Sequence, residues 1–98
     1  MDSRFIDVKV TGDSMWPTLE SGNIVRFERI EYGVLQKNQI VLSKHPLRKD
    51  FLIIKRILSI DGSKAFLVGD NPDPSASDDS HNFGLVDIRN IVAVMLAD

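Results

Sequence analysis

The sequence contains no cysteine, which excludes disulfide bonds and thiolate metal sites and fits a reducing compartment. No stretch approaches the ~18 consecutive apolar residues of a transmembrane helix, and residues 1–4 lack the basic and then apolar pattern of an export leader. The net charge is only −2 at pH 7, so nothing indicates a basic surface for nucleic acid. We therefore expect a single soluble, cytoplasmic domain over residues 1–98, with no membrane span and no nucleic-acid partner.

Internal repeats and coiled-coil heptads are also absent, and the chain instead carries short alternating or β-rich runs. Strands are expected over residues 5–10, 24–29, 39–43, 51–60, 64–68 and 91–96, the fourth and fifth forming a hairpin around Asp61-Gly62. We expect residues 30–38 and the Asp-, Pro- and Ser-rich residues 69–82 to be loops, and Asp87 to cap one helical turn. The predicted fold is mostly β, in one small domain.

A serine between a Gly-Asp turn and a proline is the first candidate for chemistry. Gly12 supplies the dihedral angles that a sharp turn needs. Pro17 keeps the residue before it extended and prevents a helix from running through Ser14. The Ser14 hydroxyl is therefore presented at the end of a strand, as a nucleophile is. Since a hydrogen-bonding turn serine is the commoner occupant of such a stretch, a nucleophile here requires a base elsewhere in the chain.

The candidate base is Lys55, which lies within the most apolar run of the sequence. By strand parity Lys55 shares a face with Ile53 and Ile57, whereas Arg56 points to the other face. Both faces are apolar, so this strand is predicted to be central. Burial lowers the pKa of an amine, and a neutral lysine can take the proton of a serine hydroxyl. The alternative is that Lys55 extends its ammonium past its neighbours to water. Arg56 does not lose its proton and is expected to be structural.

Two histidines and an acidic loop offer competing chemistry. A Ser-His-Asp triad would need His45 or His81 beside the serine, and we expect both to be surface histidines. The acidic loop has the alternating oxygen side chains of a calcium loop, but Ala76 and Asn82 stand where that loop needs a glycine and a glutamate. The sequence therefore predicts neither a metal site nor a cofactor.

Three stretches, in this order, carry a resemblance to a known family: Gly12-Asp13-Ser14-Met15-Trp16-Pro17-Thr18-Leu19, Ile54-Lys55-Arg56-Ile57, and Gly69-Asp70-Asn71 followed by Asp79-Ser80-His81-Asn82-Phe83-Gly84-Leu85-Val86. They resemble the conserved boxes of the type I signal peptidases, which are proteases with a Ser-Lys dyad. The resemblance covers residues 8–94 and implies a small β-barrel-like catalytic core of short strands. It also implies serine endopeptidase activity, with Ser14 as nucleophile and Lys55 as general base.

The resemblance assigns further roles around the nucleophile. Asp13, Ser14 and Met15 would support the site and the oxyanion, with the Ser14 N–H as one donor and Met15 packed beside it. Two positions depart from the family pattern. Gly12 stands where some members carry a serine whose hydroxyl joins the oxyanion hole. His81 stands where the family has an arginine paired with an aspartate, so we expect a weaker ion pair there.

The resemblance further implies that a serine hydrogen-bonds Lys55 and orients it. Counting back from Asp79 selects Ser77, which we prefer because it keeps its spacing to the Asp-Ser pair. Counting forward from Gly69 selects Ser75 as the alternative. The remaining residues of the third box would be structural: Gly69, Asp70, Asn71, Asp79, Ser80 and Gly84.

Within this family, the turn Lys44-His45-Pro46 and the run Val68-Gly69-Asp70-Asn71-Pro72 are similar to those of the proteases that mature nickel-type superoxide dismutases. This implies removal of the N-terminal leader of a dismutase precursor, whose new α-amine can ligate nickel. The alternatives are a signal peptidase-like protease acting on another precursor, a self-cleaving repressor-type peptidase domain, and a non-catalytic peptide-binding module. The sequence has no Ala-Gly bond of the kind that repressors cleave. Trp16 and Phe51 are expected to be core residues rather than residues that bind a leader.

Overall fold

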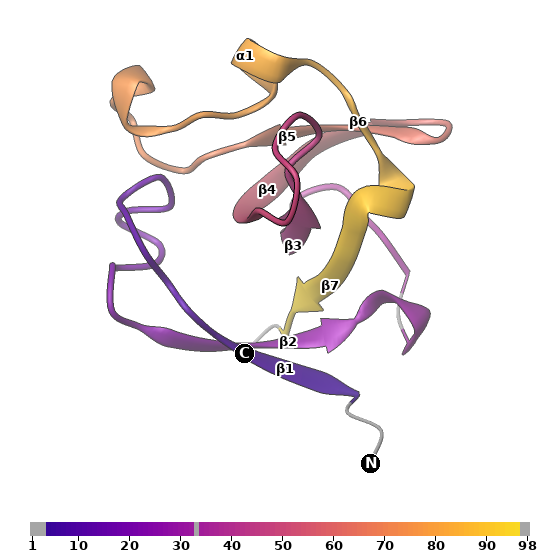
Figure 1. Cartoon of the computed structure of the whole chain (residues 1–98), viewed down its shortest axis with the longest axis horizontal. Coiled ribbons are helices and arrows are strands. Elements are labelled where there is room, and N and C mark those ends of the chain that lie inside the picture. Colours follow the sequence, from indigo (N-terminus) through magenta and orange to yellow (C-terminus); the bar gives the residue numbers. More distant parts are fainter. Residues whose placement is uncertain (1–3, 33, 97–98) are drawn as a thin grey trace.

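The computed structural model describes residues 4–32 and 34–96, which form one curled antiparallel sheet of seven strands (Figure 1). The strands are β1 (Phe5–Lys9), β2 (Ile24–Arg29), β3 (Ile40–Lys44), β4 (Leu52–Asp61), β5 (Lys64–Val68), β6 (Val86–Asp87) and β7 (Ile91–Met95). They lie in the order β1-β2-β7-β3-β4-β5-β6, and each neighbouring pair is antiparallel. The curl gives the sheet the shape of a half-barrel. The prediction of a mostly β fold is confirmed.

Alternation in the sequence accounts for the strands. In β1 the side chains of Ile6 and Val8 are half-buried, whereas Phe5, Asp7 and Lys9 are exposed, as expected for a strand with one face toward the core. The six predicted strands are confirmed to within one residue at each end, and the two-residue strand β6 was not predicted.

The helices are short: the 3₁₀ turns η1 (Ile30–Tyr32), η2 (Pro74–Ala76) and η3 (Ile88–Asn90), and the α-helical turn α1 (Ser80–Phe83). The predictions that residues 30–38 and 69–82 are entirely loop are wrong in part. The first range contains η1. In the second, Asp73 and Asp79 cap η2 and α1 by accepting hydrogen bonds from the following backbone. Asp87 caps η3, as predicted. In the part of the chain that the structure describes, no helix is long and apolar enough to cross a lipid bilayer.

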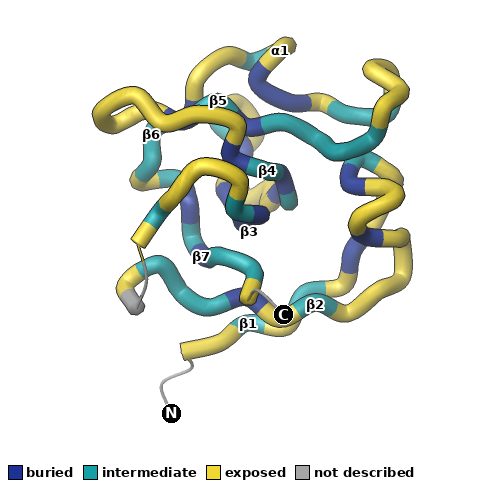
Figure 2. The backbone as a smooth tube through the Cα atoms, turned by 180° about the vertical axis from the view of Figure 1, so that it is seen from behind, coloured by how far each residue is buried: buried dark blue, intermediate teal, exposed yellow. Residues whose placement is uncertain are grey.

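Two hydrophobic clusters pack against opposite faces of β3, since Ile40 and Leu42 belong to one cluster and Val41, between them, belongs to the other. Figure 2 shows buried backbone at β3, inside the molecule. The first lies toward β1 and β2 and consists of Val10, Met15, Leu19, Phe27, Ile40, Leu42 and Ala93. The second lies toward β5 and consists of Val41, Ile57, Ala65, Leu67, Val86 and Ile91. Each fully buried aliphatic or aromatic side chain contributes about 1.5–3 kcal/mol, so these clusters stabilise the packing of the strands.

Strand β4 is central, lying between β3 and β5 as predicted. Its Ile53, Lys55 and Ile57 are buried on one face, which Val41 of β3 shares because it pairs with Lys55. On its other face Leu52 and Leu58 are exposed to solvent and Ile54 is half-buried.

Trp16 and Phe51 are not core residues, contrary to the prediction. Their exposed fractions are 46% and 41%. Trp16 lies in the turn after β1 and Phe51 directly before β4, so neither is on a strand. Hydrophobic character alone did not distinguish these positions from the interior.

Candidate active site

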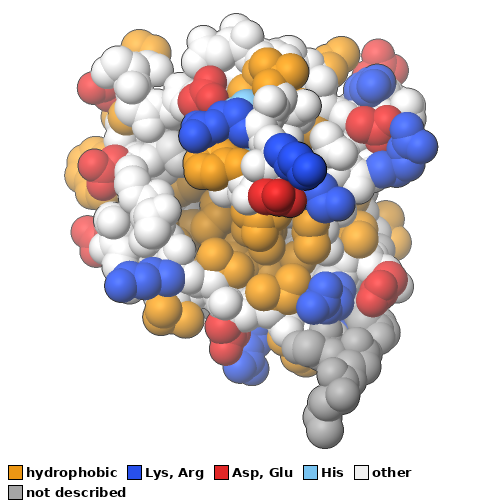
Figure 3. Space-filling model, viewed as in Figure 1, with side chains coloured by type: hydrophobic (Ala, Val, Ile, Leu, Met, Phe, Trp, Pro, Cys, Tyr) orange, Lys and Arg blue, Asp and Glu red, His pale blue; other side chains and the backbone are white. Residues whose placement is uncertain are grey.

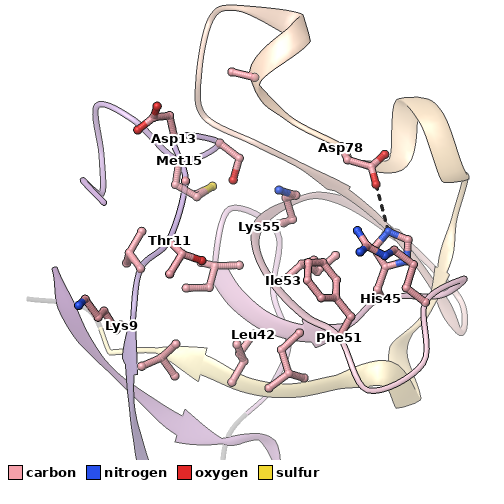
Figure 4. A pocket seen from close by; sticks show the side chains of 18 residues that line it. Lys9, Thr11, Asp13, Met15, Leu42, His45, Phe51, Ile53, Lys55 and Asp78 are labelled. Atoms are coloured by element: carbon pink, nitrogen blue, oxygen red, sulfur yellow. Dashed lines mark hydrogen bonds and ion pairs between the residues drawn. The ribbon is translucent and has the colours of Figure 1, made fainter. Parts of the chain in front are cut away.

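The end of β1 and the middle of β4 border a cleft of about 300 Å³ whose lining includes Ser14 and Lys55. Figure 3 shows this face hollowed at its centre, with hydrophobic side chains inside and charged side chains of both signs around them. Figure 4 shows the Lys55 amine directed into the cleft. The apolar lining comes from Val8, Val10, Leu42, Phe51, Leu52, Ile53 and Ile54. The fold thus brings the two candidate catalytic residues to one site.

Ser14 lies in a tight turn that follows β1. Gly12 adopts a φ of +80°, in the left-handed region that favours glycine. The Trp16 N–H donates to the Asp13 carbonyl at 3.1 Å, and Met15 is buried in the first cluster while also lining the cleft. The Ser14 N–H donates no hydrogen bond to any acceptor in the described residues. This donor therefore remains available to a developing oxyanion.

Residues 69–71 pack against the Ser14 turn and hydrogen-bond to its backbone carbonyls. The Asn71 N–H donates to the Ser14 carbonyl at 2.9 Å, and Asn71 Nδ2 donates to the Asp13 carbonyl at 2.7 Å. Gly69 packs so closely that a Cβ added there would stand 2.6 Å from the Ser14 carbonyl oxygen and would collide with Ser77 Oγ. Only glycine fits between these two groups.

An ion pair joins the strand of Lys55 to the segment that holds Ser14. Arg56 donates to Asp70 through Nε at 2.8 Å and through Nη2 at 2.7 Å, and Thr18 Oγ1 donates to the same carboxylate at 2.6 Å. The Arg56 guanidinium, helped by Thr18, holds the pKa of Asp70 below its usual range. Arg56 Nη1 also donates to the Asn38 carbonyl at 2.7 Å. These contacts give Arg56 the structural role that the sequence predicted.

Lys55 is only 4% exposed, which is unusual for a lysine. Burial lowers the pKa of its amine, although the negative charges of Asp79 and Asp78 oppose the shift. No hydrogen bond or ion pair joins the Lys55 amine to any described residue, Ser14 included. Since no fully buried side-chain nitrogen or oxygen of the described residues lacks a partner, the amine itself keeps contact with solvent in the cleft. Catalytic hydrogen bonds are often long in ligand-free enzymes and tighten with substrate. The site therefore holds a buried amine that is inclined to lose its proton.

Asp79 is held by four hydrogen bonds behind this amine. Its Oδ2 accepts from the Gly69 N–H at 3.1 Å and from Ser77 Oγ at 3.2 Å. Its Oδ1 accepts from the His81 N–H at 3.0 Å and is 2.9 Å from His81 Nδ1. Burial raises the pKa of Asp79, but these donors together hold it below its ordinary value. The exposed His81 ring thus lies against the Asp79 carboxylate.

The two serines considered for orienting Lys55 have different surroundings. Ser75 is exposed, and its hydroxyl donates to Asp73 at 2.8 Å within the cap of η2. Ser77 is half-buried against Gly69 and donates to Asp79, whose charge acts on Lys55. Neither hydroxyl hydrogen-bonds the Lys55 amine in the described residues.

Ser80 and Gly84 have structural surroundings. The buried Ser80 hydroxyl accepts from the Leu67 N–H at 2.8 Å, which ties α1 to β5. Gly84 ends α1 with a φ of +83°, and its N–H donates to the Ser80 carbonyl at 2.9 Å. Together they fix the segment that carries Asp79.

His45 lines the cleft and is only 8% exposed, so the expectation of a surface histidine is wrong for this residue. Its Nδ1 accepts from the Leu47 N–H at 3.1 Å, which leaves the proton on Nε2, and Nε2 lies 3.1 Å from Asp78 Oδ2. Because both ring nitrogens are engaged, His45 is not placed to take the proton of Ser14. Sequence reasoning missed the His45–Asp78 pair because its members lie far apart in the chain and match no local motif.

Comparison with known proteins adds no family to this picture. No protein-family model matches the chain, and no curated protein sequence matches it significantly. The chemistry of the site therefore has to be argued from its own residues.

Proposed function

We propose that the chain is a Ser-Lys endopeptidase with a signal-peptidase-type β core, in which Ser14 is the nucleophile and Lys55 the general base. The observation that carries the proposal is the buried Lys55 amine, which shares one cleft with Ser14 and has a lowered pKa. A lysine that remained charged would be expected to form an ion pair, whereas a lysine whose pKa is lowered by desolvation can be neutral and accept a proton. The contacts of Asn71 with the Ser14 turn and of Asp70 with Arg56 support the same reading, since they hold nucleophile and base together.

The reaction follows from these positions. Ser14 Oγ attacks the scissile carbonyl carbon while Lys55 Nζ accepts the hydroxyl proton, and the Ser14 N–H donates to the oxyanion. The C–N bond then breaks as the Lys55 ammonium protonates the leaving amine, which leaves an ester on Ser14. Lys55 next deprotonates a water molecule that attacks this ester. The acyl C–O bond then breaks as the Lys55 ammonium returns the proton to Ser14 Oγ, which releases the acid product and regenerates the serine hydroxyl and the neutral amine.

The substrate would bind as an extended peptide along β1. In the described sheet β1 is an edge strand that pairs only with β2, so its second edge can pair with another backbone. That edge leads directly into the Ser14 turn. The apolar lining from Val8 to Ile54 would accept apolar side chains near the scissile bond.

The particular substrate that we propose is the precursor of a nickel-type superoxide dismutase, from which the N-terminal leader is removed. This rests on the resemblance of the turn at His45 and the run from Val68 to Pro72 to the proteases that mature such dismutases. Cleavage frees an α-amine, and a free amine ligates a metal where an acylated nitrogen does so poorly.

The test is to incubate the purified chain with a nickel dismutase precursor and to read the N-terminus of the product by mass spectrometry. Ser14→Ala and Lys55→Ala should each abolish cleavage with the fold intact, whereas Lys64→Ala, which removes an exposed lysine of β5, should not. Cleavage of other leaders but not of the dismutase precursor would refute the substrate and leave the class standing. Full turnover by Lys55→Ala would refute the mechanism.

A further inference from the structure

Two carboxylates lie near the buried Lys55 amine, yet neither forms an ion pair with it. Asp78 and Asp79 both act on Lys55 electrostatically, and Asp78 lines the same cleft. An ammonium beside a carboxylate normally pairs with it, and such a contact strongly favours the charged amine. Both carboxylates are instead engaged by other donors, and the Asp78 side chain is 58% exposed.

For Asp78 the holding groups are two side chains. His45 Nε2 lies 3.1 Å from Asp78 Oδ2, and Asn82 Nδ2 donates to Asp78 Oδ1 at 3.2 Å. The His45 contact, and then that of Asn82, lower the pKa of Asp78, so its carboxylate stays charged. Figure 4 shows the Asp78 carboxylate joined to the His45 ring and not to Lys55.

His45 is a rigid donor. Its ring packs against Phe51, with ring centroids 5.8 Å apart, and against Phe83, with centroids 4.9 Å apart. The Leu47 N–H fixes the tautomer by donating to Nδ1. Since the ring is also buried, Nε2–H points at Asp78 with little freedom to leave it.

We propose that His45 is a positioning residue that, together with Asn82, holds the Asp78 carboxylate out of ion-pair contact with Lys55 and so leaves the Lys55 amine free to serve Ser14. The catalytic meaning of this inference rests on the proposed function. The contacts of His45 and Asn82 with the Asp78 carboxylate, which we call the tether, can be tested without any substrate.

The other charged groups around the amine do not substitute for this tether. Asp79 is held by four hydrogen bonds, two of them from the backbone. Asp13 is exposed on the Ser14 turn, and the remaining charged residues of the cleft, Lys9 and Arg48, are cations. Asp78 is thus the carboxylate of this cleft that is held by side chains alone and that single substitutions can release.

The experiment measures the pKa of Lys55 directly, by following its side-chain carbon and nitrogen resonances during a pH titration of lysine-labelled protein. The Lys55 signal is assigned by its loss in Lys55→Arg. Asp78→Asn should lower the pKa of Lys55 further, because a negative charge is removed. His45→Ala should raise the proton affinity of the Lys55 amine about tenfold or more, which is a rise in its pKa, because the released Asp78 carboxylate can then pair with the ammonium. Asn82→Ala, at an exposed position, should raise it less and covers the case in which His45→Ala fails to fold.

Three comparisons make the test specific. His45→Gln, whose amide can again donate to Asp78, should restore most of the wild-type value. His45→Ala should have no effect once Asp78→Asn is present, since the carboxylate through which His45 acts is gone. Asp61→Asn, which removes an equal charge at the far end of β4, should leave Lys55 unchanged.

If the Lys55 signal titrates identically in wild type, Asn82→Ala and folded His45→Ala, the inference is overturned. If the pKa of Lys55 changes as expected but no peptidase activity exists, the tether stands and the proposed function fails. In the active enzyme at a pH below the pKa of Lys55, His45→Ala should lose kcat/KM in proportion to the smaller fraction of neutral amine, about tenfold, and should regain it at high pH. A loss that is equal at all pH values would contradict the inference.

Discussion

Replacing Gly69 by alanine would push apart the two segments that form the candidate site. The added Cβ would lie 2.6 Å from the Ser14 carbonyl oxygen and 2.9 Å from Ser77 Cβ, and closer still to Ser77 Oγ. Ordinary contacts between such atoms are about 3.5 Å, so the neighbours must separate by about 1 Å. The Ser14 carbonyl cannot yield freely, because it accepts the Asn71 N–H at 2.9 Å. We expect a loss of about 1–3 kcal/mol in the free energy of unfolding and about a hundredfold loss in kcat/KM from the displaced nucleophile.

Urea denaturation and steady-state cleavage of the precursor measure the two effects separately. Gly62→Ala is the matched control, since Gly62 has a φ of +60° and nothing within 4 Å of its added Cβ. That variant should lose about 1 kcal/mol through backbone strain and keep its activity while it is folded. If Gly69→Ala retained full activity and stability, the contact between residues 69–71 and the Ser14 turn would not hold the nucleophile in place.

Three further substitutions test the surroundings of the base. Lys55→Met should abolish activity and raise the free energy of unfolding at neutral pH, because the folded chain no longer holds a charge away from water. Since the pKa of Lys55 is lowered in the folded state, this gain should shrink as the pH approaches the ordinary lysine value of 10.5 and vanish above it. Urea denaturation across the pH range checks this, and a gain that grows with pH would contradict the burial effect. Asp70→Asn should cost about 1.5–3 kcal/mol, the value of a hydrogen-bonded charge, and lower kcat/KM, because Arg56 loses its partner; unchanged thermal stability would show that the pair does not brace the site. Ser77→Ala should lower kcat/KM about fivefold, the equivalent of one hydrogen bond of about 1 kcal/mol. Ser75→Ala should keep kcat/KM within about twofold of wild type. The reverse order would assign the orienting role to Ser75.

The sequence was informative wherever a local pattern determines the structure. Alternation located the strands, and parity within β4 placed Lys55 on the same face as Ile53 and Ile57, which the structure buries together. The Gly-Asp turn before Ser14 was likewise visible, since Gly12 takes the positive φ that such a turn needs. These are short-range properties, and they require no knowledge of what packs against the element.

The misses came from contacts between distant segments. His45 was expected at the surface, but Phe51 and Phe83 cover it, and its partner Asp78 comes from beyond β5. The same aspartates that suggested a loop proved to be caps of helical turns, as Asp79 is for α1. A composition rich in Asp, Pro and Ser favours loops and helix starts alike, so it does not distinguish them.

The geometry around Ser14 adds detail that the motif alone did not contain. The three boxes are linked physically: Asn71 holds the Ser14 turn, Asp70 joins Thr18 to Arg56, and Arg56 lies next to Lys55 on β4. This linkage explains why residues distant in sequence would be needed together for one chemistry. Among the described residues the Ser14 N–H has no acceptor, and the Lys55 amine faces the cleft.

Acylation of Ser14 tests the central claim most directly, since it depends on the nucleophile and the base but not on the identity of the substrate. The purified chain is treated with a β-lactam acylating reagent from about pH 6 to about pH 10, and the site of modification is mapped by peptide mass spectrometry. We predict a single adduct on Ser14, formed faster as the pH rises through the lowered pKa of Lys55 and lost in Lys55→Ala. Acylation of Ser14 at an undiminished rate in Lys55→Ala, or a rate in the wild type that does not change with pH, would contradict a serine activated by Lys55.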